Sequence, residues 1–199
     1  MTLLNLVKQW VAENGTNTGP YMRQNKQQLM ANEMTQVKQK LYRGTVVNAN
    51  TLKNKQCVQY SSSRLQSWTQ NLNTATIYTL QRKTPGNSKV PVIFVGNTTD
   101  ARVNGLDLQQ VYKNYKVNNI STNKNIETVL NRPVYVAQFQ NAVKHKDGVY
   151  HVPVKFLYSH NNIIASNKKP TQTLLNKCLT YLKRKRNNQP TKPVKTVKI

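Results

Sequence analysis

Acidic residues are scarce in this chain of 199 residues. Six Asp and Glu side chains occur in total, and none lies between Gly148 and the end at Ile199. Nucleases that hold Mg²⁺ need clustered carboxylates, and these six are scattered: Glu13, Glu33, Asp100, Asp107, Glu127 and Asp147. Metal-dependent phosphoryl transfer is therefore disfavoured. We expect a non-enzymatic protein with no catalytic residue, no metal and no cofactor.

Cysteine is almost absent too, and several other signals are missing. The two cysteines, Cys57 and Cys178, lack the paired spacing of a metal site or redox motif, which predicts two buried, reduced thiols. No apolar stretch approaches membrane-spanning length, so we expect no membrane span. The chain also has no phosphate-cradling glycine loop and no nucleophile elbow.

Positive charge is what the sequence has in excess. Thirty Lys and Arg residues against six acids give a formal net charge of +24. Self-repulsion of this size destabilises a compact chain, and a polyanionic partner would relieve it. We therefore predict a nucleic acid partner, RNA or DNA, bound through basic side chains that release counterions. The candidate contacts are Arg82, Lys83, Lys155, Lys168, Lys169, Lys177, Lys183, Arg184, Lys185, Arg186, Lys192, Lys195 and Lys198.

Apolar periodicity predicts helices in the first part of the chain. Residues 3–11 carry apolar side chains at helical spacing behind Thr2, a plausible cap. A second, longer helix is predicted over 21–42, because Met22, Leu29, Met30 and Leu41 share one face. An alternative function is that of an interaction module, which docks a protein partner through the apolar helix 22–41.

The middle of the chain alternates strand and helix signals. Residues 44–47 and 57–60 are candidate short strands. Stretches 74–80 and 90–95 are rich in β-branched and aromatic residues, which predicts a hairpin with a basic tip at 82–87. Asp107 is placed to cap one short helix and Thr122 another, ending before Pro133.

The clearest strand signal lies at 150–158, where apolar and polar residues alternate after the turn 145–148. Its predicted partner is 134–143. His145, His151 and Lys155 surround this hairpin, and they are the residues that a nucleic-acid-processing enzyme would use, which is a further alternative. Beyond it, Pro170 begins a predicted last helix that ends in the basic run 183–186.

These elements predict an α+β fold with N-terminal helices, a mainly antiparallel sheet built from hairpins, a C-terminal helix and a basic arm. A β-barrel or jelly-roll core is the alternative. The predicted regions are 1–43 (helical), 44–186 (α+β core domain) and 187–199 (flexible basic C-terminal arm).

The function that this composition favours is structural. We predict a component of a nucleoprotein particle such as a viral capsid, nucleocapsid or core, which self-associates or binds other particle proteins. The expected location is intracellular, in a virion or a nucleoprotein particle. A ribosomal protein that binds rRNA is the alternative within the same class, because it also combines a small domain with a basic tail.

Overall fold

The computed structural model describes residues 2–14, 24–54, 56–82, 88–117, 127–159 and 195–198. Its helices are α1 (Leu3–Asn14), α2 (Gln24–Asn32), α3 (Ala49–Lys53), α4 (Leu72–Gln81), α5 (Leu108–Asn114) and the short 3₁₀ helix η1 (Phe139–Asn141). Its strands are β1 (Thr35–Gln36), β2 (Lys40–Asn48), β3 (Cys57–Ser61), β4 (Gln66–Thr69), β5 (Lys89–Asn97), β6 (Asn104–Asp107), β7 (Glu127–Leu130), β8 (Pro133–Gln138), β9 (Val143–Lys144), β10 (Tyr150–Ser159) and β11 (Lys195–Lys198).

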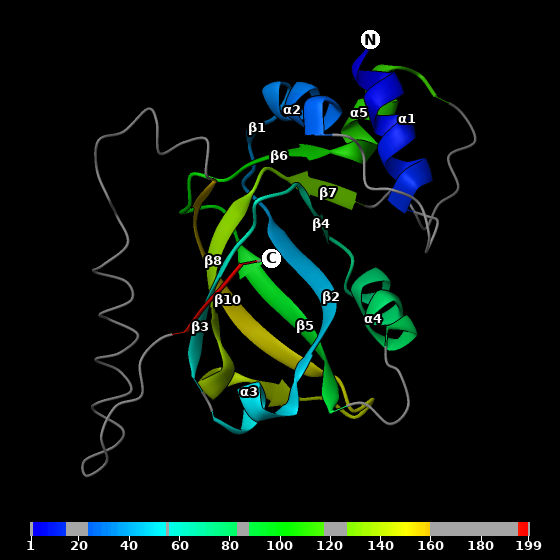
Figure 1. Ribbon diagram of the computed structural model, residues 1–199. Coiled ribbons are helices and arrows are strands. Elements are labelled where there is room, and N and C mark those ends of the chain that lie inside the picture. Colours follow the sequence, from blue (N-terminus) through cyan, green and yellow to red (C-terminus); the bar gives the residue numbers. More distant parts are fainter. Residues whose placement is uncertain are drawn as a thin grey trace, which may run out of the picture.

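One large mixed sheet organises the molecule (Figure 1). Ten strands follow the order β1-β6-β7-β4-β2-β5-β10-β8-β3-β11, and β9 pairs with β10. Every pairing is antiparallel except β5 with β10 and β3 with β11. The two ends of this path, β1 and β11, do not pair in the described part of the chain. The predicted α+β class is therefore confirmed, and the barrel alternative is wrong.

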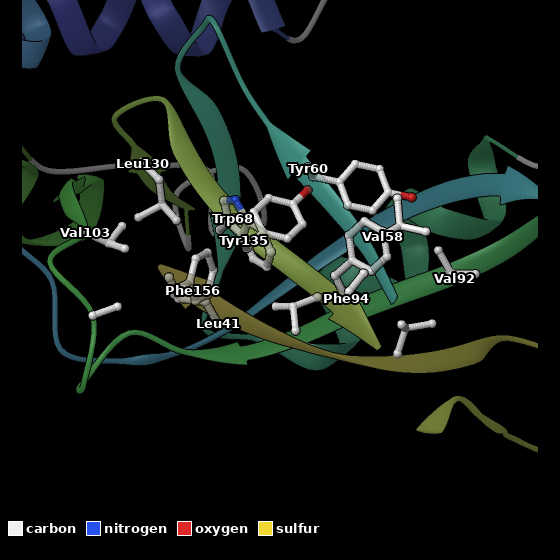
Figure 2. Close-up of a cluster of buried hydrophobic side chains, with 14 of the residues drawn as sticks. Leu41, Val58, Tyr60, Trp68, Val92, Phe94, Val103, Leu130, Tyr135 and Phe156 are labelled. Carbon is white, nitrogen blue, oxygen red and sulfur yellow. The ribbon is translucent and has the colours of Figure 1, made fainter. Parts of the chain in front are cut away.

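The main core lies inside the curved sheet and is built from aromatic rings (Figure 2). Trp68 meets Phe156 edge-on with ring centroids 4.8 Å apart, and it meets Tyr135 at 5.4 Å. Phe94 packs against Tyr135 at 5.8 Å. Offset and edge-to-face contacts of this kind stabilise a core beyond the area they bury. These rings fix β4, β5, β8 and β10 relative to one another.

A second core lies between the sheet and three helices, α1, α2 and α5 (Figure 1). Val7, Met30 and Leu108, one from each helix, are fully buried there against Val129 of β7. The predicted first helix is confirmed as α1. The predicted helix after Asp107 is confirmed as α5, whose first N–H groups at Gln109 and Gln110 donate to the Asp107 carboxylate.

Three of the predicted elements are wrong where the structure describes them. The predicted helix over 21–42 ends at Asn32, and β2 begins at Lys40 because its β-branched run pairs with β5 over nine residues. The stretch 74–80 is helix α4 rather than a strand, so the predicted hairpin with 90–95 does not exist. The end of the predicted helix after Thr122 is strand β7.

The predicted hairpin around the turn 145–148 is confirmed. β8 and β10 pair antiparallel, and the turn closes with Gly148 at a φ of 80° donating to the His145 carbonyl at 3.0 Å.

Cys57 is disulfide-bonded, so the prediction of a reduced thiol at this position is wrong. The predicted helix from Pro170 lies outside the described residues, as does most of the predicted arm. Lys195–Lys198 forms β11 beside β3.

Candidate active site

Glu127 is the acid that the fold places among buried groups. It is the first residue of β7 and lies opposite Thr69 of β4. Trp10 of α1 donates its indole N–H to Glu127 Oε1 at 2.8 Å. Burial raises the pKa of Glu127, while side-chain hydrogen bonds from Ser67 and Trp10 and the charge of Arg43 oppose that rise. A carboxyl group perturbed by both burial and specific partners marks a candidate functional site.

Ser67 approaches Glu127 from β4, the neighbour of β7, and Arg43 approaches it from β2, the next strand beyond β4. The sheet order β7-β4-β2 makes these three strands consecutive neighbours. Ser67 lies two residues before Thr69 in β4, so its side chain shares a face with the residue opposite Glu127. Arg43 of β2 donates from Nη1 to the Ser67 carbonyl at 2.6 Å. Three adjacent strands therefore bring a carboxylate, a hydroxyl and a guanidinium together. We refer to these three residues as the Glu127 triad.

The charge of Glu127 affects the pKa of two tyrosines on different helices. Tyr112 of α5 is buried and Tyr78 of α4 is 44% exposed. Burial raises the pKa of each tyrosine, and the negative charge of Glu127 raises it further. Arg82, at the C-terminal cap of α4, acts in the opposite direction on Tyr78. The charge of Glu127 therefore acts on one buried and one exposed tyrosine.

The structure places few of the predicted nucleic-acid contacts. Arg82 is exposed at the end of α4, and Lys155 is exposed on β10. Lys195 and Lys198 belong to β11. Lys83 and the predicted contacts from Lys168 to Lys192 lie outside the described residues. Among the predicted contacts that the structure describes, Arg82 lowers the pKa of Tyr78, which the charge of Glu127 raises.

The structure brings His145 and His151 together beside the hairpin. The His145 and His151 rings stack with centroids 3.7 Å apart. Burial and the neighbouring His145 lower the pKa of His151, whereas Asp147 raises it. Within the described ranges, no group of three or more His, Cys, Asp or Glu side chains could hold a metal ion.

The triad was missed at the level of sequence, although a signal for it exists. Arg43 interrupts the strand Leu-Tyr-Arg-Gly-Thr-Val-Val, and Glu127 begins the strand Glu-Thr-Val-Leu. A lone charge in a mostly apolar strand is costly unless it is paired, so each such position is a candidate for function. What the sequence lacked was the strand order that joins them.

Comparison with solved structures finds chains that are similar to this one. No family model and no curated protein sequence matches the chain. Among solved structures, the Vis toxin, an ADP-ribosyltransferase from Vibrio splendidus, is similar at 13% identity and a TM-score of 0.48, covering 67% of this chain and 54% of that one. Vis in complex with agmatine gives 12% identity, a TM-score of 0.45, and coverage of 73% and 59%.

A third similar structure is the ADP-ribosyltransferase HopU1 of Pseudomonas syringae, with 13% identity, a TM-score of 0.38, and coverage of 67% of this chain and 49% of that one. The chain therefore spans about half the length of these proteins. Values this low assign no activity by themselves, so an activity has to be argued from the residues of the site.

The comparisons correct three predictions. The structures that resemble this chain are enzymes, so the prediction of a non-enzymatic structural protein of a viral or other nucleoprotein particle is contradicted. The expectation of no enzyme is contradicted with it, as is the description of the chain as a capsid, virion or RNA-binding structural protein. Within the described residues, no helix is both long and apolar enough to cross a membrane.

Proposed function

We propose that this protein is an ADP-ribosyltransferase, which transfers the ADP-ribose group of NAD to an acceptor. The observation that carries the proposal is the Glu127 triad, in which three adjacent strands bring a carboxylate, a hydroxyl and a guanidinium together. The Vis toxin and HopU1 are ADP-ribosyltransferases, which agrees with this proposal.

The carboxylate suits the breaking of a glycosidic bond. When the bond between nicotinamide and the ribose C1′ breaks, nicotinamide leaves with the electron pair and C1′ develops positive charge, as in other oxocarbenium-like transition states. A fixed carboxylate stabilises that charge most where water is largely excluded. Glu127, fixed by the Trp10 indole and only partly exposed, provides such a carboxylate. The acceptor then forms a bond to C1′ and gives up a proton to Glu127 or to solvent.

The guanidinium suits the other end of the substrate. NAD carries a diphosphate, and arginine binds phosphate oxygens through a planar fork of N–H donors. Arg43 holds its guanidinium against the Ser67 carbonyl at 2.6 Å, which limits its rotation. In this arrangement the guanidinium of Arg43 binds the anionic diphosphate of NAD. The carboxylate of Glu127 then faces the ribose C1′, which becomes cationic.

The direct test is an assay of the purified full chain with NAD. We expect nicotinamide release, and transfer of labelled ADP-ribose when an acceptor is present. Release in the absence of an acceptor would show that water serves as acceptor. Neither release nor transfer, with protein folded by circular dichroism and with cell extract supplied as a source of acceptors, would contradict the proposal.

Arg43→Lys should weaken NAD binding by about 10-fold to 100-fold, because one lost hydrogen bond between charged groups contributes about 1.5–3 kcal/mol. Lysine keeps the charge but loses the planar fork. The KM for NAD in the release assay measures the effect. Arg64→Lys is the matched control, since Arg64 is exposed. An equal KM in wild type and Arg43→Lys would remove Arg43 from substrate binding.

The nucleic acid partner remains a proposal of its own. We propose that RNA or DNA binds the predicted basic contacts, because no acid lies between Gly148 and Ile199. Truncation after Asn176 should weaken polynucleotide binding severalfold, and truncation after Arg186 should weaken it less. Salt titrations measure both, and light scattering on the same samples tests self-association. Unchanged affinity in both truncations would remove this role from the C-terminal segment.

A further inference from the structure

We propose that Trp10 is a positioning residue for the reaction, and that its indole N–H fixes the Glu127 carboxylate in the site. This inference rests on the proposed function, because it assigns Glu127 the role of the catalytic carboxylate. It makes the N-terminal helix α1 part of the machinery of the site rather than a cover over the sheet.

The contact itself is specific. Trp10 Nε1 lies 2.8 Å from Glu127 Oε1, across 117 residues of sequence. An indole N–H donates and cannot accept, so it cannot take the proton that Glu127 receives. A donor of this kind favours the ionised carboxylate over the protonated form. The other carboxylate oxygen of Glu127, Oε2, is not bonded to Trp10.

Packing keeps the indole in place. Trp10 is only 4% exposed, and it lies in the second core, between the sheet and the helices, with Leu6 and Val7 of its own helix. Lys26 of α2 donates to Gln9 of α1 at 2.8 Å, which ties the two helices together beside Trp10. An indole held in this way keeps its N–H aimed at one point. A group on an exposed loop would lose this precision through rotamer freedom.

The other charged and titratable groups that act on Glu127 come from four neighbouring elements. Arg43 lies on β2, Tyr78 on α4 and Tyr112 on α5, and Ser67 on β4 gives the second hydrogen bond. Arg43 stabilises the ionised carboxylate through charge, whereas Trp10 contributes a directed hydrogen bond. Removing the indole N–H therefore changes orientation and pKa without changing the net charge of the site.

Trp10→Phe is the variant that tests this role, because it keeps an aromatic ring and removes the N–H. We expect kcat to fall about tenfold, as expected for one lost hydrogen bond to a charged group, with KM for NAD nearly unchanged. The acidic limb of the pH profile should move to higher pH, because Glu127 loses a group that favours its ionised form.

Trp68→Phe is the matched control. Trp68 is also buried, at 2% exposure, and its indole N–H also donates to a side chain, Gln66 Oε1 at 3.2 Å. It should lose stability much as Trp10→Phe does but leave the acidic limb where it is. An unchanged acidic limb and kcat in Trp10→Phe, or the same shift in both variants, would overturn the inference.

A readout that does not depend on activity separates this inference from the proposed function. The chain has three glutamates, Glu13, Glu33 and Glu127, so ¹³C labelling of glutamate gives a carboxyl spectrum that Glu→Gln variants assign. The pKa of Glu127 should be higher in Trp10→Phe than in wild type. A higher pKa in a protein with no transferase activity would overturn the function and keep the contact. Activity in wild type with no pKa change in Trp10→Phe would overturn the inference alone.

Discussion

Glu127→Gln should lower the rate of nicotinamide release from NAD by about 100-fold to 1000-fold, the usual effect of removing one group that stabilises transition-state charge. Glutamine has nearly the same shape and still accepts from the Trp10 indole, so the fold should be retained. What it lacks is the negative charge next to the ribose carbon. The loss should therefore appear in kcat, with a smaller change in KM.

Glu33→Gln is the control for this substitution, since Glu33 is an exposed carboxylate at the end of α2. It makes the same chemical change and should keep full activity. Thermal unfolding of both variants checks that each is folded. If Glu127→Gln keeps wild-type kcat while folded, Glu127 does not act in the reaction, and the carboxylate chemistry of the proposal is wrong.

The pH dependence of the wild-type enzyme follows from the same residue. Burial raises the pKa of Glu127, so the carboxylate loses its charge at a higher pH than an exposed glutamate does. The rate should fall as pH drops through that raised pKa, because only the ionised form stabilises positive charge. This gives the acidic limb that the Trp10→Phe variant is designed to move.

Sequence reasoning worked where local signals and tertiary structure agree. Residues 3–11 have apolar periodicity and a capping threonine, and α1 begins at Leu3 behind Thr2. Asp107 accepts from the Gln109 N–H at 3.0 Å and starts α5 as its position predicts. The alternation at 150–158 matches β10. In each case one stretch of sequence contains the whole signal.

It failed where contacts distant in sequence decide the local structure. The stretch 74–80 has β-branched and aromatic residues that favour a strand, yet it is helix α4. Asn71 caps it by accepting from the Thr74 N–H at 3.2 Å, and Ala75 and Thr79 face the sheet. The large apolar residues Ile77 and Leu80 are exposed on the other side. Close packing on β2 outweighs propensity here.

The site escaped prediction for a similar reason. Arg43, Ser67 and Glu127 lie far apart in the chain and become neighbours only through the order β2-β4-β7. The scarcity of acids disfavours a site that needs clustered carboxylates. A reaction that needs one carboxylate is compatible with six scattered acids, so the scarcity argued only against metal-binding clusters.

Gly44 is the residue that allows α4 to pack onto the sheet beside the triad. It follows Arg43 directly in β2. A Cβ built at Gly44 would overlap the Ala75 carbonyl oxygen and the Thr79 hydroxyl, and it would lie 3.0 Å from the Thr79 nitrogen. Two of these atoms belong to the helix backbone, which cannot move as a flexible side chain does. The approach of α4 to β2 therefore requires a residue with no side chain.

Gly44→Ala should destabilise the protein by about 2–4 kcal/mol, at the upper end for overpacking because backbone has to shift. Chemical denaturation measures this, and the melting temperature should fall by on the order of 10 °C. Gly148→Ala is the control. Its φ of 80° costs about 1–2 kcal/mol, but a Cβ there meets nothing within 4 Å.

The two glycine variants also differ in their expected effect on activity. A shift of α4 away from β2 moves the strand that carries Arg43, as well as the helix that carries Tyr78. Gly44→Ala should therefore lower the rate of nicotinamide release even at temperatures where the protein remains folded, whereas Gly148→Ala should keep it. Equal stability in wild type and Gly44→Ala would mean that α4 does not pack on Gly44. Lower stability with full activity would mean that the triad keeps its geometry independently of α4.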